Sequence, residues 1–122
     1  MANIFLIEND FIMYESLKYL LAKRGYTVYA YMDIQTALKD LGKYSIDILL
    51  VDLYINDYSI IKNFIFEVIK LFSELNIIFM CTYLDNHLLH NINQHIKKSC
   101  YFLIKPFDLN ELFVLIDKLL GK

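Results

Sequence analysis

The feature that most constrains this sequence is an alternation of short apolar runs with longer amphipathic segments. The runs are rich in β-branched and aromatic residues, which favour strands, and they cover residues 4–7, 27–31, 48–51, 77–81 and 101–104. Strands that alternate with helices predict an α/β fold in which right-handed crossovers build a parallel sheet with helices on both faces. The run 48–51 is apolar throughout, so we expect it to be a central strand that is buried on both faces.

The segments between these runs carry apolar residues at spacings of three or four, which predicts helices. The expected helices cover residues 11–24, a short segment after Asp33, and then 61–75, 86–98 and 108–120. Gly25 stands where a left-handed C-terminal cap is expected, and Asp108 with Glu111 matches a capping box.

Composition favours one domain over residues 1–122. Hydrophobic residues make up 57% of the chain and the net charge is −2, which excludes a disordered chain. No basic block is present, so we expect no nucleic-acid binding.

The sequence also favours a cytoplasmic location. No apolar run approaches the roughly 18–20 residues of a membrane span, and the N-terminus lacks a basic segment of the kind that begins a signal peptide. The lack of a membrane span also predicts no membrane association. Cys81 and Cys100 lie in apolar stretches without CxxC spacing, so we expect free thiols.

Polar side chains follow four of the five predicted strands. The carboxyl ends of parallel strands meet at one edge of a sheet, where ligands of such folds bind, so scattered residues can converge there. These residues are Glu8, Asn9, Asp10, Asp52, Thr82 and Lys105.

This group suits phosphoryl transfer to a carboxylate. Carboxylate and amide oxygens bind Mg²⁺, which can neutralise an incoming phosphoryl group. Asp52 can attack phosphorus and form an aspartyl phosphate. Lys105 supplies a positive charge, and the Thr82 hydroxyl can donate a hydrogen bond to a phosphoryl oxygen.

The whole chain resembles the receiver domain of response regulators, the family of the bacterial chemotaxis regulator. The turn 8–10 stands at the family's acidic metal-binding pair, and Asp52 within Leu-Leu-Val-Asp-Leu matches the phospho-acceptor. Thr82 lies thirty residues further on, at the switch hydroxyl, and 105–107 matches the Lys-Pro motif. The resemblance implies a flavodoxin-like, doubly wound five-stranded sheet of order 2-1-3-4-5, with five helices in three layers.

The resemblance further implies a two-component or phosphorelay role, with a histidine kinase or histidine phosphotransfer protein as donor and Mg²⁺ as cofactor. The backbone carbonyl of Tyr54 would join the metal ligands, Phe102 would be the aromatic switch, and the Lys105–Pro106 bond would be cis. Phosphorylation would alter a surface over 87–120 that binds a partner or a second copy of the chain. No enzymatic activity is expected beyond self-phosphorylation from a donor and autodephosphorylation.

Three departures from the family pattern keep a second hypothesis open. Asn9 replaces the second acid, which lowers the expected Mg²⁺ affinity; Asp10 could compensate. Tyr83 follows Thr82 where the family has a small residue, and Ile60 stands where it generally keeps glycine, so loop 54–60 must find another backbone conformation. The alternative is a degenerate pseudo-receiver, which would be a phosphorylation-independent interaction or dimerisation module.

Simpler interpretations also exist for these residues. Asp52 or the turn 8–10 could only cap helices, and Phe102 could be an ordinary core aromatic. A metal site at His87, His90 and His95 is disfavoured, because their helical directions do not converge. A flavodoxin-type cofactor site is disfavoured too, because the acidic turn would repel a phosphate.

Overall fold

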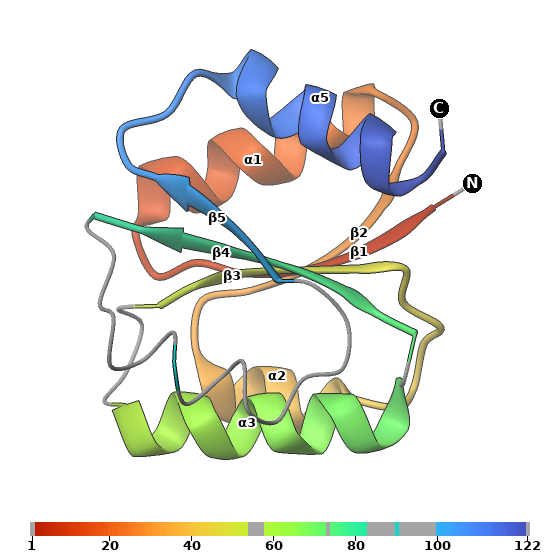
Figure 1. Ribbon diagram of the computed structural model, residues 1–122, viewed down its shortest axis with the longest axis vertical. Helices are drawn as coiled ribbons and strands as arrows, with labels where there is room; N and C mark the ends of the chain where they lie inside the picture. The colour runs from red at the N-terminus through yellow and green to blue at the C-terminus, as the bar shows by residue number, and fades with distance from the viewer. Residues whose placement is uncertain (1, 54–57, 73, 83–89, 91–99, 122) are drawn as a thin grey trace.

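A parallel five-stranded sheet forms the middle layer of the computed structural model (Figure 1). The structure describes residues 2–53, 58–72, 74–82, 90 and 100–121. The strands are β1 Asn3–Ile7, β2 Thr27–Tyr31, β3 Ile48–Asp52, β4 Asn76–Cys81 and β5 Cys100–Ile104. Their order is β2-β1-β3-β4-β5, and every neighbouring pair is parallel, which confirms the predicted topology.

Helices cover both faces of this sheet, as the sequence predicted. They are α1 Phe11–Lys23, α2 Ile34–Asp40, α3 Tyr58–Leu71 and α5 Leu109–Leu119. Helices α1 and α5 lie on one face and α2 and α3 on the other, which gives three layers (Figure 1). The helix expected over 86–98 lies outside the described residues except for His90.

Strand β3 shows why the sheet is buried on both faces. All five of its residues are buried, and the side chains of its four apolar residues alternate between two hydrophobic cores. Leu49 and Val51 pack in the core under α2 and α3, whereas Ile48 and Leu50 pack in the core under α1 and α5. Each such side chain contributes roughly 1.5–3 kcal/mol to stability, so a polar substitution in β3 would disrupt either core.

Aspartate caps begin three of the helices. The carboxylate of Asp10 accepts the backbone N–H of Met13 at 3.0 Å, and that of Asp33 accepts the N–H of Thr36 at 2.7 Å. Asp108 accepts the N–H of Asn110 rather than that of Glu111, so the predicted capping box forms only as a simple cap. Gly25 has φ of +98°, as expected for a left-handed residue after α1.

Helix α3 begins earlier than the sequence predicted. It covers Tyr58–Leu71 instead of 61–75, so Ile60 lies inside the helix. No described residue other than glycine has positive φ, and Ile60 therefore avoids the conformation that a β-branched residue resists. Part of the expected 54–60 loop is thus helical, because Tyr58, Ser59 and Ile60 extend the helix by almost one turn.

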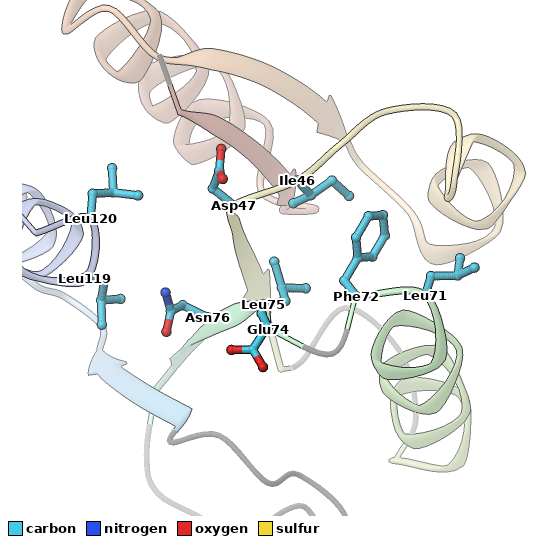
Figure 2. Close-up of a pocket in the computed structure, with 9 residues that line it drawn as sticks. All are labelled: Ile46, Asp47, Leu71, Phe72, Glu74, Leu75, Asn76, Leu119 and Leu120. Carbon is cyan, nitrogen blue, oxygen red and sulfur yellow. The ribbon is translucent and has the colours of Figure 1, made fainter.

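The two ends of the sheet differ. The carboxyl ends of the strands hold the predicted polar cluster. At the amino ends, a hollow of about 510 Å³ lies among the end of α3, the start of β4 and the end of α5 (Figure 2). Asp47 and Asn76 border it from the starts of β3 and β4, and Leu119 borders it from α5. Within the described residues, no helix has the length and apolar character needed to cross a membrane.

Candidate functional site

Three elements position the central residues of the site. Glu8 follows β1, Asp52 is the last residue of the neighbouring strand β3, and Lys105 follows β5. The backbone N–H of Lys105 donates to the carbonyl of Cys81 at 2.6 Å, which attaches this segment to the end of β4. The parallel order therefore brings three residues distant in sequence to one edge of the sheet.

The Lys105 ammonium lies between two carboxylates. Its Nζ is 2.5 Å from Oε1 of Glu8 and 3.5 Å from Oδ2 of Asp52. The Glu8 side chain is fully buried, that of Asp52 is 7% exposed and that of Lys105 is 20% exposed. The expected convergence of these three residues is therefore present.

The surroundings of Glu8 raise the pKa of its carboxyl group. Its pKa is raised to about 7: burial raises it most, a hydrogen bond to Asp52 and the negative charge of Asp52 also raise it, and Lys105 lowers it. Oε2 of Glu8 is buried and has no hydrogen-bond partner within the described part of the chain. The negative charge of Asp52 therefore favours the binding of a proton or a cation at the Glu8 carboxylate.

Asn9 and Asp10 are both exposed. The Asp10 carboxylate caps α1 through Met13, the helix-cap interpretation that the sequence also allowed. No described contact directs Asp10 toward Asp52, and its participation in metal binding stays a prediction.

Thr82 lies beside Lys105 on the same edge. Both border a hollow of about 380 Å³ with Asp10, Met13 and Phe107. Thr82 is exposed, so its hydroxyl is accessible to a ligand. Sequence reasoning assigned no role to Met13, although its place one turn after Asp10 in the helix predicts that it faces the same side.

Phe102 lies on β5, partly buried against the core under α3. Its ring stacks on that of Phe79 with centroids 5.2 Å apart. This contact agrees with a core aromatic, and a switching role for Phe102 stays a prediction. The Lys105–Pro106 bond is cis, as the resemblance implied. Cys81 and Cys100 are free thiols, as expected.

Several predicted residues lie outside the described part of the chain. They are Tyr54, whose carbonyl was expected to bind a metal, and Tyr83, His87 and His95. His90 is described and exposed.

The donors at this edge fit a hard divalent cation such as Mg²⁺. Glu8, Asn9 and Asp52 offer only oxygen ligands, which such ions prefer, and the buried Oε2 of Glu8 is an anionic oxygen without a protein donor among the described residues. No group of three His, Cys, Asp or Glu side chains in the described ranges could by itself hold a metal. The amide of Asn9, backbone oxygens and waters would therefore complete any such site.

Comparisons with known proteins agree with this fold. Residues 4–117 match the family model described as response regulator receiver domain. The transcriptional regulatory protein CrdR of Helicobacter pylori is 32% identical over 111 residues, which are 89% of this chain. The chain spans 50% of the length of that relative.

Solved structures show the same fold. A two-component response regulator from Clostridium difficile superposes with a TM-score of 0.82 at 17% identity, covering 100% of this chain and 98% of that one. A response regulator from Thermotoga maritima gives 0.78 at 22% identity, covering 100% and 99%. Together with the family match, these findings confirm the resemblance seen in the sequence: the chain belongs to the response regulator receiver domain family.

Proposed function

We propose that this chain is a phosphoacceptor receiver of a two-component or phosphorelay system, in which Asp52 accepts a phosphoryl group from a phosphohistidine. The observation that supports this most directly is the Lys105 ammonium, 3.5 Å from the Asp52 carboxylate at the edge of the sheet where ligands of such folds bind. Family membership supports signalling by a receiver domain.

The chemistry needs little beyond position and charge. An Asp52 oxygen forms a bond to phosphorus while the bond from phosphorus to the donor imidazole nitrogen breaks, and the imidazole keeps that electron pair. The Lys105 ammonium neutralises phosphoryl oxygens, and the exposed Thr82 hydroxyl donates a hydrogen bond to one of them.

Mg²⁺ is the proposed cofactor. Glu8, Asn9, Asp52 and the carbonyl of Tyr54 would hold it, and it would supply positive charge beside the transferred group. Asn9 contributes an oxygen without a charge, so we expect weaker binding than an aspartate there would give. Chemistry beyond accepting and hydrolysing the phosphoryl group is not proposed.

The partners proposed for this receiver are a histidine kinase or a histidine phosphotransfer protein in the cytoplasm. We propose that the surface that responds to phosphorylation lies over residues 87–120. Its described part includes Ile104 and Val114, apolar side chains that are 42% and 68% exposed. Apolar exposure of this size suits a protein partner, although single exposed side chains also occur on surfaces without one.

A pseudo-receiver is the second candidate function. It is favoured by the departures from the family pattern at Asn9, Tyr83 and Ile60. The exposed surface of α5 around Val114 would then join two copies without phosphorylation. Glu111 and Lys118 flank Val114 on this face, so a two-fold axis would bring opposite charges together across the interface.

Intact-mass spectrometry after incubation with acetyl phosphate and Mg²⁺ tests the first proposal. We expect a phosphoryl adduct on the unmodified chain that disappears in Asp52→Ala and persists in Asp47→Ala, a matched removal of a carboxylate at the opposite end of the sheet. A folded chain that never forms the adduct would favour the pseudo-receiver. Sedimentation of the unphosphorylated chain would then test whether it dimerises.

A further inference from the structure

Glu8 and Asp52 compete for one ammonium, and Glu8 holds it more closely. The separation from Lys105 Nζ is 2.5 Å for Glu8 and 3.5 Å for Asp52. The first pair is hydrogen-bonded, at a separation shorter than is usual for a charge-assisted bond, whereas the second separation exceeds that range. Lys105 is thus attached to the carboxylate that does not accept the phosphoryl group.

Both ends of this attachment are fixed by the sheet. The backbone N–H of Glu8 donates to the carbonyl of Tyr31 at 3.0 Å, which ties Glu8 to the end of β2. The backbone of Lys105 is tied to Cys81 at the end of β4. With both backbones held, the Glu8–Lys105 hydrogen bond restricts the flexible lysine side chain.

The charges at the site make the position of the Lys105 ammonium important in this chain. The site has two carboxylates, at Glu8 and Asp52, and an amide at Asn9. Lys105 is the cation that the described structure places among them. An ammonium at a fixed point beside Asp52 lowers the reorganisation needed when a phosphoryl group arrives.

We propose that Glu8 is a positioning residue that holds the Lys105 ammonium beside Asp52, a role distinct from binding a metal. This inference rests on the proposed function, because positioning matters only if Asp52 accepts a phosphoryl group. The contact itself can be tested without phosphorylation.

The two roles of Glu8 have different kinetic consequences. If Glu8 only binds Mg²⁺, Glu8→Gln raises the Mg²⁺ concentration that gives half the maximal rate and leaves the rate at saturating Mg²⁺ unchanged. If Glu8 positions Lys105, the rate at saturating Mg²⁺ falls as well. We expect a fall of about tenfold, because misplacing a reacting group is costly even when binding is complete.

The experiment measures phosphorylation by acetyl phosphate across a Mg²⁺ titration for the unmodified chain, Glu8→Gln and Glu15→Gln. Glu15 is an exposed carboxylate on α1, so its variant controls for the loss of one negative charge. In parallel, NMR of the lysine side chains with Mg²⁺ absent reports the environment of Lys105. We expect its ¹³Cε signal to move in Glu8→Gln and to stay in place in Glu15→Gln.

A Lys105 signal that does not move in Glu8→Gln overturns the proposal, as does a change confined to the half-saturating Mg²⁺ concentration. Glu8→Asp provides a second variant if Glu8→Gln does not fold. It keeps the charge and the ligand oxygens but shortens the side chain by one methylene, so we expect the same displaced Lys105 signal. If the unmodified chain accepts no phosphoryl group, the proposed function fails, while the NMR arm still decides whether Glu8 holds Lys105.

Discussion

The two ends of the sheet both carry carboxylates, but these carboxylates differ in burial and in their bonding partners. At the amino ends, Asp47 is exposed, and its Oδ2 accepts the backbone N–H of Asn3 at 2.7 Å beside the hollow in Figure 2. At the carboxyl ends, Glu8 and Asp52 are buried, and the ammonium of Lys105 serves both.

This difference separates a carboxylate that joins two strands from the buried carboxylates that the proposed function places at the site of phosphoryl transfer. Asp47 accepts a hydrogen bond from the backbone amide of Asn3 and its side chain is exposed, so it joins β1 to the segment that begins β3. Glu8 and Asp52 depend on a side-chain cation, and burial makes their charge expensive. If the proposed function holds, a cation or phosphoryl group would offset this buried negative charge at the carboxyl ends of the strands.

The largest expected effect comes from removing the shared cation. Lys105→Met leaves Glu8 and Asp52 buried without their ammonium, and we expect a loss of about 4 kcal/mol in the free energy of unfolding at pH 8. Urea unfolding followed by circular dichroism measures this change.

A matched control for this variant is Lys43→Met. Lys43 pairs with Asp40 at 2.9 Å, but its side chain is 60% exposed, so the pair is screened by water. We expect no resolvable change in stability. Losses of equal size in the two variants would show that burial does not distinguish the two ion pairs.

The parallel sheet and the cluster at its carboxyl edge could be predicted from the sequence, because strand topology alone brings these residues together. Short apolar runs separated by helical patterns predicted the parallel sheet, and parallel strands bring their carboxyl ends together. The convergence of Glu8, Asp52 and Lys105 followed from that, without knowledge of any side-chain contact.

The contacts inside the cluster could not be predicted. Asp10 stands next to Asn9 in the sequence and resembles a metal ligand equally well, yet its carboxylate caps α1. A side chain at a strand end can turn toward the helix or toward the site, and spacing alone does not decide between them. The start of α3 was also misplaced, because residues 54–60 were assigned to a loop by the family pattern, whereas Ile60 lies inside the helix.

The pH dependence of stability gives the second largest effect. The pKa of Glu8 is raised to about 7 in the folded chain from an ordinary value of 4.5. Between these values only the folded state keeps the proton, so stability is greatest below about pH 4.5 and falls as the pH rises to about 7.

Relative to Glu8→Gln, we therefore expect the unmodified chain to lose up to about 3 kcal/mol across this range. Urea unfolding of both chains at several pH values measures the difference, since groups away from this cluster titrate alike in the two. A difference that stays constant with pH would mean that Glu8 is ionised throughout and that Lys105 fully offsets its burial.

The smallest expected effect belongs to the amino end of the sheet. Asp47→Ala removes the acceptor for the backbone N–H of Asn3, but that amide is exposed and water replaces the lost bond. We expect a loss of about 0.5 kcal/mol in the free energy of unfolding, measured by urea titration, and no change in Lys105. A loss as large as that of Lys105→Met would mean that the contact between Asp47 and Asn3 contributes as much to stability as the buried ion pairs of Lys105.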